Sequence, residues 1–438
     1  MDIRQLADDE TVVLVYDLHI GGSGGDEIFA SAPELTEFLV DLQRTPGPVQ
    51  LVIVGDFFDV ERMGNPSAAR EGILHTLSRA DYGDLWAAFR QFRQVDGYRV
   101  VYVIGNHDVA IWRDRTLQQL LLSNDIVDEI SLSYAAQYRS LPGRLDYAEH
   151  GNQFDASNRF ADYDNPLDKP IGDYVVSDIV RPIGGRAVVG STVDLAQINF
   201  VFPLRAVPEW LTGRVFYRFL TDIAYLLIIP VLVINAASAA ISCFFAGDDD
   251  DELTALRTLF GQISYGALLL ILMMVVVFVI ARRVAERAVS VMTPRFGGRK
   301  TEPELIRELL LLHDSSPQGP GIDARDIAVF VSAHTHSPAM TALDRPDGRR
   351  VAVVNTGCWL RQLHSVRARL HAPRVYVPVY VQSHLVVRRA ADGLTVELWN
   401  RPKPAERQLP WMERLAIAGR APARTTTTAP TQLSQEAV

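Results

Sequence analysis

The chain has 438 residues, of which 48% are apolar, and it carries a formal net charge of −9. That length allows one large catalytic domain with an appended segment. The acidic balance gives no basic patch of the kind that binds nucleic acid, so we expect no nucleic-acid partner. The cysteines, Cys243 and Cys358, do not support a disulfide framework and favour a reducing compartment.

Five short segments, far apart in the sequence, contain side chains that commonly bind metals. In chain order they are Asp17-Leu18-His19, Gly55-Asp56-Phe57-Phe58-Asp59, Gly105-Asn106-His107-Asp108, His150-Gly151-Asn152 and His334-Thr335-His336. All except the fourth follow a short apolar run rich in β-branched residues, at Thr11–Tyr16, Leu51–Val54, Val100–Ile104 and Ile327–Ser332. Such runs predict buried parallel strands, and open α/β sheets place their sites at the carboxyl ends of the strands. We therefore expect the five segments to meet in one crevice.

This order of motifs resembles the calcineurin-like metallophosphoesterase superfamily, whose pattern is D-x-H, G-D-x-x-D, G-N-H-[DE], a histidine before glycine, and G-H-x-H. The resemblance covers about Val12 to Asn355, and Ala333 stands where the family usually has a glycine. It implies an α/β fold, a four-layer αββα sandwich, and hydrolysis of a phosphate ester or pyrophosphate. A more distant resemblance to UDP-2,3-diacylglucosamine pyrophosphatases is confined to the motif order and to the start Asp17–Gly21, and it favours a lipid substrate only modestly.

By this resemblance, seven side chains bind two divalent cations. Asp56 would bridge the cations, Asp17, His19 and His336 would complete one site, and Asn106, His150 and His334 would complete the other. Two cations about 4 Å apart can polarise a phosphoryl group and activate a water for in-line attack. A donor set of oxygen and nitrogen without cysteine suits manganese, iron or zinc.

The same resemblance gives His107 and Asp108 catalytic roles. His107 would stabilise the phosphoryl group or protonate the leaving oxygen, and Asp108 would orient or charge its imidazole. Asp59 would support these side chains from behind. Arg62 and Arg113 follow two of the loops, where each could grip a phosphate or lie in a solvated loop.

Two further segments lie close to the motifs in the sequence. Asn355–Trp359 follows an apolar run and either closes the crevice or forms a plain turn. Asn152–Asp155 continues the His150 loop, and we expect its polar groups to line the edge of the site.

Two apolar runs, Ala224–Phe245 and Ile263–Ala281, interrupt the motif order between the fourth and fifth segments. Each approaches the ~20 residues that a helix needs to cross a bilayer core. The acidic segment Gly247–Glu252 between them cannot remain in lipid, so the pair predicts a transmembrane hairpin; a buried hairpin or an oligomerisation arm is the alternative. The expected domains are 1–215 (catalytic, ending in a cap segment), 216–285 (hairpin), 286–410 (catalytic) and 411–438 (a tail of disordered composition).

Arginines flank this hairpin on both sides. Three of them, Arg205, Arg214 and Arg218, precede it and a group at Arg282–Lys300 follows it, whereas the turn holds only Arg257. The positive-inside rule therefore predicts a cell-membrane protein with two helices and a cytoplasmic catalytic domain.

The remaining elements complete the expected catalytic domain. Pro303–His313 predicts an amphipathic helix, and Leu409–Ile417 has a weak amphipathic pattern typical of a membrane-surface segment. Strands of a second sheet are expected at Val351–Val354, Val375–Val381, Leu385–Arg389 and Leu394–Leu398.

Three classes of function fit these features. The leading hypothesis is a membrane-anchored hydrolase of a phosphate ester or pyrophosphate in an amphiphilic, lipid-linked substrate. The alternative is the same chemistry on a soluble nucleotide or phosphoprotein. A catalytically inactive scaffold is the third, although a scaffold has no physical need to keep every ligand together with His107 and Asp108. The sequence leaves the substrate, the metals and the oligomeric state open.

Overall fold

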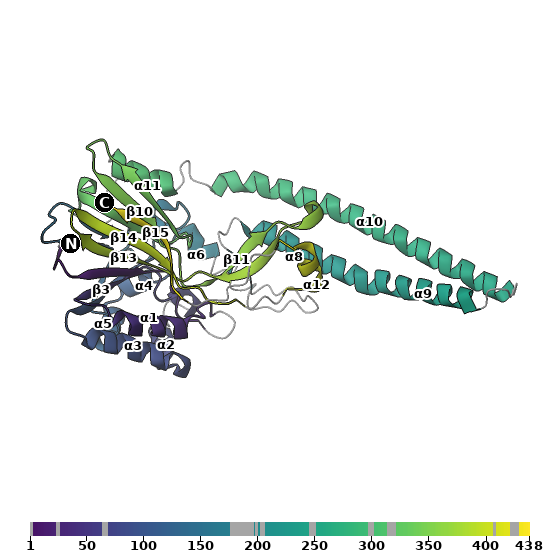
Figure 1. Cartoon of the computed structure of the whole chain (residues 1–438), viewed down its shortest axis with the longest axis horizontal. Coiled ribbons are helices and arrows are strands. Elements are labelled where there is room, and N and C mark those ends of the chain that lie inside the picture. The colour runs from purple at the N-terminus through teal and green to yellow at the C-terminus, as the bar shows by residue number, and fades with distance from the viewer. Residues whose placement is uncertain are drawn as a thin grey trace.

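The computed structural model describes residues 3–22, 27–63, 69–175, 197, 200–201, 206–244, 251–296, 302–312, 321–405, 409–420 and 429–438. Figure 1 shows a layered α/β body from which a pair of long helices projects, with both termini on the body, away from the tip of the helices. Most of the expected cap, Asn165–Val207, and residues 247–250 of the acidic turn lie outside the described residues.

The first sheet has seven strands in the order β15-β14-β13-β2-β3-β4-β5. Its parallel part consists of β2 (Thr11–Val15), β3 (Val49–Val54), β4 (Tyr98–Val103) and β5 (Glu129–Ser131). Its antiparallel part consists of β13 (Ser383–Ala390), β14 (Gly393–Asn400) and β15 (Thr431–Ala437). Three runs expected to precede metal-binding loops are therefore adjacent parallel strands.

The second sheet has six strands in the order β1-β6-β7-β8-β10-β9. They are β1 (Arg4–Leu6), β6 (Tyr134–Tyr138), β7 (Leu145–Ala148), β8 (Ile327–Ser332), β9 (Ala339–Asp344) and β10 (Arg350–Asn355). β8 is parallel to both of its neighbours, β7 and β10. The run Ile327–Ser332, which precedes the fifth motif, therefore lies inside this sheet.

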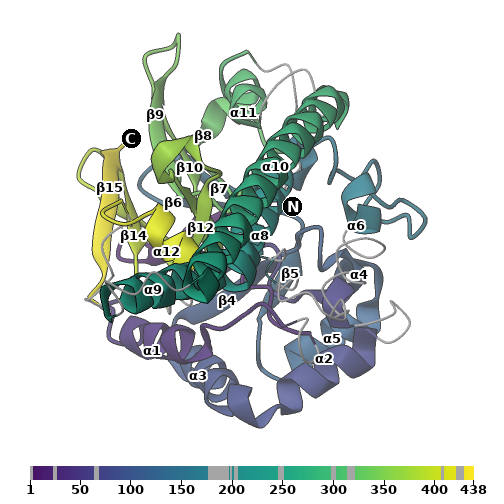
Figure 2. The ribbon, with the colours of Figure 1, turned by 90° about the vertical axis from the view of Figure 1, so that its right-hand side faces the viewer.

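The packing of alternate side chains shows how the layers are ordered. Along β2, Val13 and Val15 face a helical layer, whereas Val12 and Leu14 face the second sheet. That helical layer includes α1 (Ala32–Leu42), α2 (Ala69–Ser78), α3 (Gly83–Gln94) and α5 (Arg115–Ser123), and α11 (Glu302–Leu311) packs on the outer face of the second sheet (Figure 2). The layers run helix, sheet, sheet, helix, and the predicted mixed α/β class is confirmed.

Short helices occupy the connections between these layers. They are α4 (Val109–Arg113), α6 (Ile171–Val175) and α12 (Trp411–Ala416), with the 3-10 turns η2 (Val60–Met63), η4 (Ala80–Tyr82), η5 (Asn152–Phe154), η10 (Ala324–Asp326) and η11 (Arg369–His371). The expected helix over Pro303–His313 is α11, one residue earlier at its start.

The strands expected to form the second sheet are mostly placed elsewhere. Only Val351–Val354 belongs to that sheet, as part of β10. β12 (Val375–Tyr380) pairs with β11 (Arg361–Val366) in a separate two-stranded ribbon, and β13 and β14 join the first sheet. The prediction was wrong because β2 has a free edge beside the parallel strands, and β13 pairs with it.

The disordered tail expected over 411–438 is corrected in its described parts, whereas 421–428 lie outside the described residues. Its first part forms α12, and its last part forms β15 on the edge of β14, closed by mutual backbone hydrogen bonds of 2.9 and 2.6 Å between Val438 and Leu394. Most of β15 is exposed because it lies at the edge of the sheet. Its polar composition therefore resembles that of a disordered segment although its backbone is paired.

The helix pair begins with α8 (Val207–Ile223), which passes through the π-helical turn η9 (Ala224–Ile228) into α9 (Ile229–Phe244). α10 (Asp251–Phe296) returns beside it (Figure 2). Two helical stretches here, Val207–Ala240 and Thr254–Met273, are long and apolar enough to span a membrane.

The apolar surface of this helix pair is exposed. Leu226, Leu232 and Leu268 are each more than 60% exposed. The Asn235 side-chain amide donates a hydrogen bond of 2.8 Å to the Ser264 hydroxyl, so two of the few polar groups in the runs face each other. This pattern is the inverse of a soluble helix pair, in which the apolar side chains would be between the helices or against the body.

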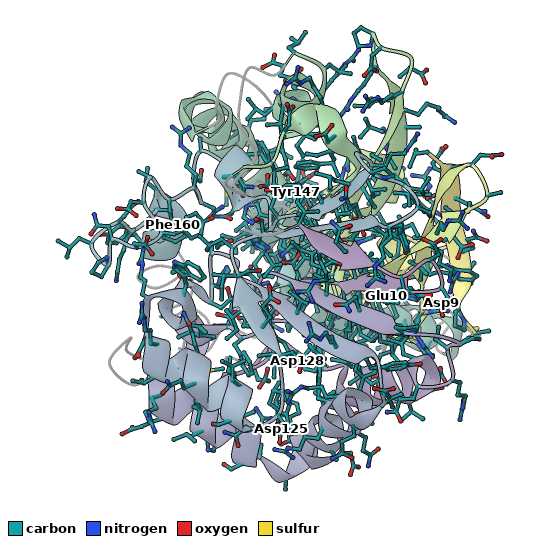
Figure 3. The ribbon with its side chains drawn as sticks, turned by 90° about the vertical axis from the view of Figure 1, so that its left-hand side faces the viewer. Asp9, Glu10, Asp125, Asp128, Tyr147 and Phe160 are labelled. Atoms are coloured by element: carbon teal, nitrogen blue, oxygen red, sulfur yellow. The ribbon has the colours of Figure 1, made fainter. Side chains whose placement is uncertain are left out.

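The helix pair projects from the end of the body to which the parallel strands point. Asp9 and Glu10, which precede β2, and Asp128, which binds the Val100 amide near the start of β4 at 2.8 Å, appear in the view of the opposite end (Figure 3). The carboxyl ends of these strands, and the loops that follow them, consequently lie toward the helices.

Candidate metal centre

The loops that carry the predicted ligands are joined directly to one another. The His19 amide donates to the Asp56 carbonyl oxygen at 2.7 Å, and the His107 amide donates to Asp56 Oδ1 at 2.9 Å. The His334 amide donates to Asp17 Oδ2 at 3.0 Å, which links the loops of the two sheets. The expectation that distant motifs meet at strand ends is met for all five segments, and His150 also follows a strand, β7.

The backbone of these loops adopts conformations that side chains rarely tolerate. In the described chain, seven non-glycine residues have a positive φ, and five of them are predicted ligands: Asp17 (42°), His19 (48°), Asp56 (49°), His334 (62°) and His336 (56°). Each such residue costs roughly 1–3 kcal/mol, and such conformations concentrate at functional sites. The fold therefore holds these side chains in place against local strain.

Two motif glycines make the close approach of the loops possible. A Cβ atom on Gly55 would lie 2.0 Å from His150 Nδ1, and one on Gly105 would lie 2.2 Å from Asp56 Oδ1. Because no side chain fits at these positions, the glycines of the G-D and G-N motifs are needed to bring Asp56 and His150 together.

Asp56 lies at the middle of the cluster. Its Oδ2 is 3.3 Å from His150 Nε2 and 3.5 Å from His19 Nε2, so one carboxylate oxygen faces imidazoles on two sides. Three groups of side chains have their potential ligand atoms within 4.8 Å of one another: Asp17, His19 and His336; His19, Asp56 and His107; and Asp17, Asp56 and His150.

Unpartnered polar atoms show that this cluster fits metal ions. Asp17 Oδ1 and His19 Nε2 are buried and have no hydrogen-bond partner in the described structure. Leaving such atoms unpaired is costly, and a cation would satisfy both. The donors are carboxylate oxygens and imidazole nitrogens, a set that suits manganese, iron or zinc.

The charges of the cluster point to the same conclusion. Burial raises the pKa of Asp17 well above its usual value, and the neighbouring Asp56 carboxylate raises it further. Although its own burial opposes protonation, His150 has a pKa raised to about 9 by Asp56 and Asp17. Both shifts show that the buried carboxylates repel one another and attract positive charge, which a bound cation would supply.

Asn106 and His334 occupy different positions relative to the cluster. Asn106 Oδ1 is 3.1 Å from His150 Nε2, so Asn106 lies beside the expected second metal position. The His334 imidazole instead has its Nε2 3.1 Å from Asp155 Oδ2, and its ring centroid is 5.3 Å from that of His150. His334 belongs to none of the three groups found among the described residues.

The surroundings of His107 differ from the expected ones. Its Nδ1 lies 3.3 Å from Asp59 Oδ1 and 3.3 Å from Glu61 Oε2, and although burial opposes this, the two carboxylates raise its pKa well above the usual value. Asp108 is turned away from this imidazole. It accepts hydrogen bonds from the Gly105 amide at 2.6 Å, from the Phe57 amide at 2.9 Å and from Tyr102. Asp108 thus fixes the loops, and Asp59 and Glu61 orient His107.

Asp59 supports the cluster in the expected way. Its Oδ2 lies 3.1 Å from His19 Nδ1, which directs His19 Nε2 toward Asp56. Arg62 Nε donates to the same oxygen at 2.8 Å, so Arg62 holds Asp59 and does not extend toward a phosphate. Arg113 likewise donates to the Tyr163 and Asp168 carbonyl oxygens, at 2.7 and 3.2 Å, and holds a loop.

Residues near β11 also contact the metal loops. The Trp359 amide donates to the Asp17 carbonyl oxygen at 3.3 Å, and the Asn355 side chain donates to the Ala333 carbonyl oxygen at 2.8 Å. The Asn355–Trp359 segment therefore lies against the crevice. Gln362, which the motifs did not indicate, donates to the His336 carbonyl oxygen at 2.8 Å.

Two acidic residues at the site were missed in the sequence. Glu61 is next to Arg62 in a connection without a motif spacing, and Glu302 begins α11 directly after the helix pair. Burial raises the pKa of Glu302 to about 8, in the field of His150 and Asp155. Asp155, expected only at the edge, is the partner of His334.

Comparison with known proteins adds no further assignment. No protein-family model matches the sequence, and the curated proteins contain no match. The relation to metallophosphoesterases therefore stays a resemblance carried by the motifs.

Proposed function

We propose that the protein is a calcineurin-like metallophosphoesterase, a phosphoric ester hydrolase that works with two divalent cations, manganese, iron or zinc. The observation that carries the proposal is the position of Asp56 Oδ2 between His19 Nε2 and His150 Nε2, where one carboxylate oxygen would serve two metals. Asp17, His19 and His336 would hold one cation, and Asn106, His150 and His334 the other. For His334 this requires its imidazole to leave Asp155.

When bound, the cations would polarise the phosphoryl group and activate a water. Side chains of the protein would supply the proton and orient the ligands. Asp59 and Glu61 favour the charged form of His107, which can donate its proton to the leaving oxygen. Asp59 also fixes the ring of His19, and Arg62 fixes Asp59.

The exposed apolar helices favour a site at a membrane. With α9 and α10 in a bilayer, the expected arginine distribution would place the body in the cytoplasm, at the face of the cell membrane. We propose that the substrate is a phosphate ester or pyrophosphate that is membrane-associated or lipid-linked.

Metal-stripped, detergent-purified protein should regain hydrolysis when manganese, iron or zinc is added, and Asp56→Asn should not. A substrate panel should contain lipid phosphates, nucleotide-linked lipids, soluble nucleotides and phosphopeptides. Turnover of amphiphiles alone supports the proposal, whereas turnover of the soluble compounds alone supports the alternative. No turnover of any compound at any metal loading contradicts the hydrolase assignment.

The orientation is tested by cysteine labelling of intact cells. Asp249→Cys in a Cys243→Ala background should react with a membrane-impermeant thiol reagent, and Arg424→Cys should react only after lysis. Cys358 needs no replacement because it is buried and burial raises its pKa to about 12. The reverse labelling pattern would contradict the cytoplasmic placement.

A further inference from the structure

The ribbon β11–β12 and α12 are fastened to the base of the helix pair. The Tyr217 hydroxyl of α8 donates to the Pro373 carbonyl oxygen at 2.6 Å, and a Cβ atom on Gly213 would lie 2.7 Å from the Arg374 carbonyl oxygen. On the side of α12, Arg214 pairs with the buried Glu413 at 3.0 Å. The ribbon tip (366–374) and α12, which we term the collar, therefore have a fixed position along α8 (Figure 1).

This position coincides with the start of the apolar run. The Trp411 ring of α12 contacts the Tyr225 ring, with centroids 6.2 Å apart, and Tyr225 is the second residue of the run that begins at Ala224. Tryptophan and tyrosine concentrate where a membrane core meets its headgroups. The collar is consequently at the height expected of the headgroup layer.

The outer surface of the collar combines exposed leucines with arginines. Leu370 is 96% exposed and has a φ of 54°, and Leu415 is 60% exposed. The same segments contain exposed arginines, at Arg367, Arg369, Arg374, Arg414 and Arg420.

Most of these arginines have no acidic partner in the part of the chain that the structure describes. The nearby acids Glu413, Glu209 and Asp222 are engaged by Arg214, Arg374 and Arg218 respectively. Among the described residues, no carboxylate forms an ion pair with Arg367, Arg369, Arg414 or Arg420. Exposed leucines beside arginines that form no ion pair among the described residues match the chemistry of an anionic lipid surface.

We propose that the collar binds the anionic headgroup layer of the bilayer, with Leu370 and Leu415 inserted among the lipids. This inference rests on the proposed membrane insertion of α9 and α10. A bilayer is favoured over a protein partner because the collar is continuous with the exposed apolar helices and lies where their apolar run begins.

Binding there would also orient the metal centre. β11 runs from the collar to Gln362, whose side chain holds the His336 carbonyl oxygen. The ribbon and this hydrogen bond therefore connect the proposed headgroup contact to a metal-binding loop.

The test uses the full-length protein with an environment-sensitive fluorophore attached at Leu370→Cys in the Cys243→Ala background. The protein is placed in lipid nanodiscs of phosphatidylcholine alone or with added phosphatidylglycerol. We expect a blue shift and higher intensity in the anionic discs, reduced at about 0.5 M salt because ions screen the arginines. A label at Leu415→Cys should respond in the same way. The control label at Leu312→Cys, exposed on the body beyond α11, should not change.

A charge variant with Arg367→Gln, Arg369→Gln and Arg414→Gln should lose the response to phosphatidylglycerol. The matched control, Arg349→Gln with Arg350→Gln on the exposed side of the body, should keep it. If the protein enters the discs but the labels remain in water, the collar does not bind the headgroup layer, and the proposed function is unaffected. An equal shift in both lipids overturns the binding of anionic headgroups. Failure to enter discs contradicts the membrane insertion, and with it both the collar proposal and the lipid-linked substrate, but not the hydrolase assignment.

Discussion

The metal centre and the helix pair depart from ordinary burial in opposite directions. At the centre, Asp17, Asp56 and Asp59 are almost wholly buried although carboxylates avoid such positions. On the helix pair, leucines and valines are exposed over most of two long helices. Each arrangement is costly in water alone, the first for unpaired charge and the second for apolar surface. Under the proposed function, a cation would relieve the first cost and lipid would relieve the second.

The largest effect is expected when the central carboxylate is removed. Asp56→Asn keeps the volume of the side chain but removes the negative charge that faces both His19 and His150. We expect loss of measurable hydrolysis and of bound metal, because two close cations no longer share an anionic ligand. Metal content by mass spectrometry and turnover of a small chromogenic ester measure both.

The matched control for this variant is Asp344→Asn, an exposed carboxylate paired with Arg350 at 3.3 Å. It should retain metal and activity. If Asp56→Asn kept two metals per chain, the bridging role would be wrong even if the rate fell.

The next test removes the helix pair. Replacing Ile223–Ala281 with a short Gly/Ser linker removes exposed apolar surface, whose transfer from water to lipid is favourable by roughly 25 cal/mol per Å². The shortened protein should therefore stay in solution without detergent. Hydrolysis of a small soluble ester should be largely retained, whereas turnover of a bilayer-embedded substrate should fall steeply. Equal loss on both substrates would mean that the helices serve the fold of the metal centre.

The sequence predicted some features of these two regions and not others, depending on the kind of interaction that fixes them. The ligand loops were predictable because buried strand runs, motif glycines and metal-binding side chains leave local signals, as at Gly55 and Asp56. The roles of Asp108 and Asp155 were not, because their partners are set by loops that meet only in the folded chain. The placement of β13 likewise depends on which strand edge is free, a tertiary property that no pattern within Leu385–Arg389 encodes.

A smaller effect is expected from the carboxylate behind the ligands. Asp59→Asn weakens the orientation of His19 and His107 without removing a predicted ligand. Loss of such a supporting partner typically costs about 10–100-fold in activity or metal affinity. The variant should therefore bind metal at saturating concentration and turn over slowly. Complete loss of metal even at saturation would show that Asp59 is itself a ligand.

The smallest effect concerns a buried carboxylate outside the metal centre. Asp146, on β7 between the two sheets, has neither oxygen hydrogen-bonded among the described residues, and burial raises its pKa to about 7. It is an internal control for the comparison, because it is buried like Asp56 but belongs to no potential metal group in the described structure.

The pKa of Asp146 fixes the sign of its effect on stability. The unfolded carboxyl titrates near about 3.9. Between that pH and 7 the unfolded chain has lost the proton and the folded chain keeps it, so the free energy of unfolding falls as pH rises through this window. Three pKa units correspond to a cost of at most about 4 kcal/mol, fully present above pH 7. Asp146→Asn cannot ionise, so its gain in thermal unfolding midpoint over the original protein should be larger at pH 8 than at pH 5. The ligand carboxylates titrate in both proteins and cancel in this difference. An equal gain at both pH values would mean that Asp146 is ionised in the fold and is compensated by a partner.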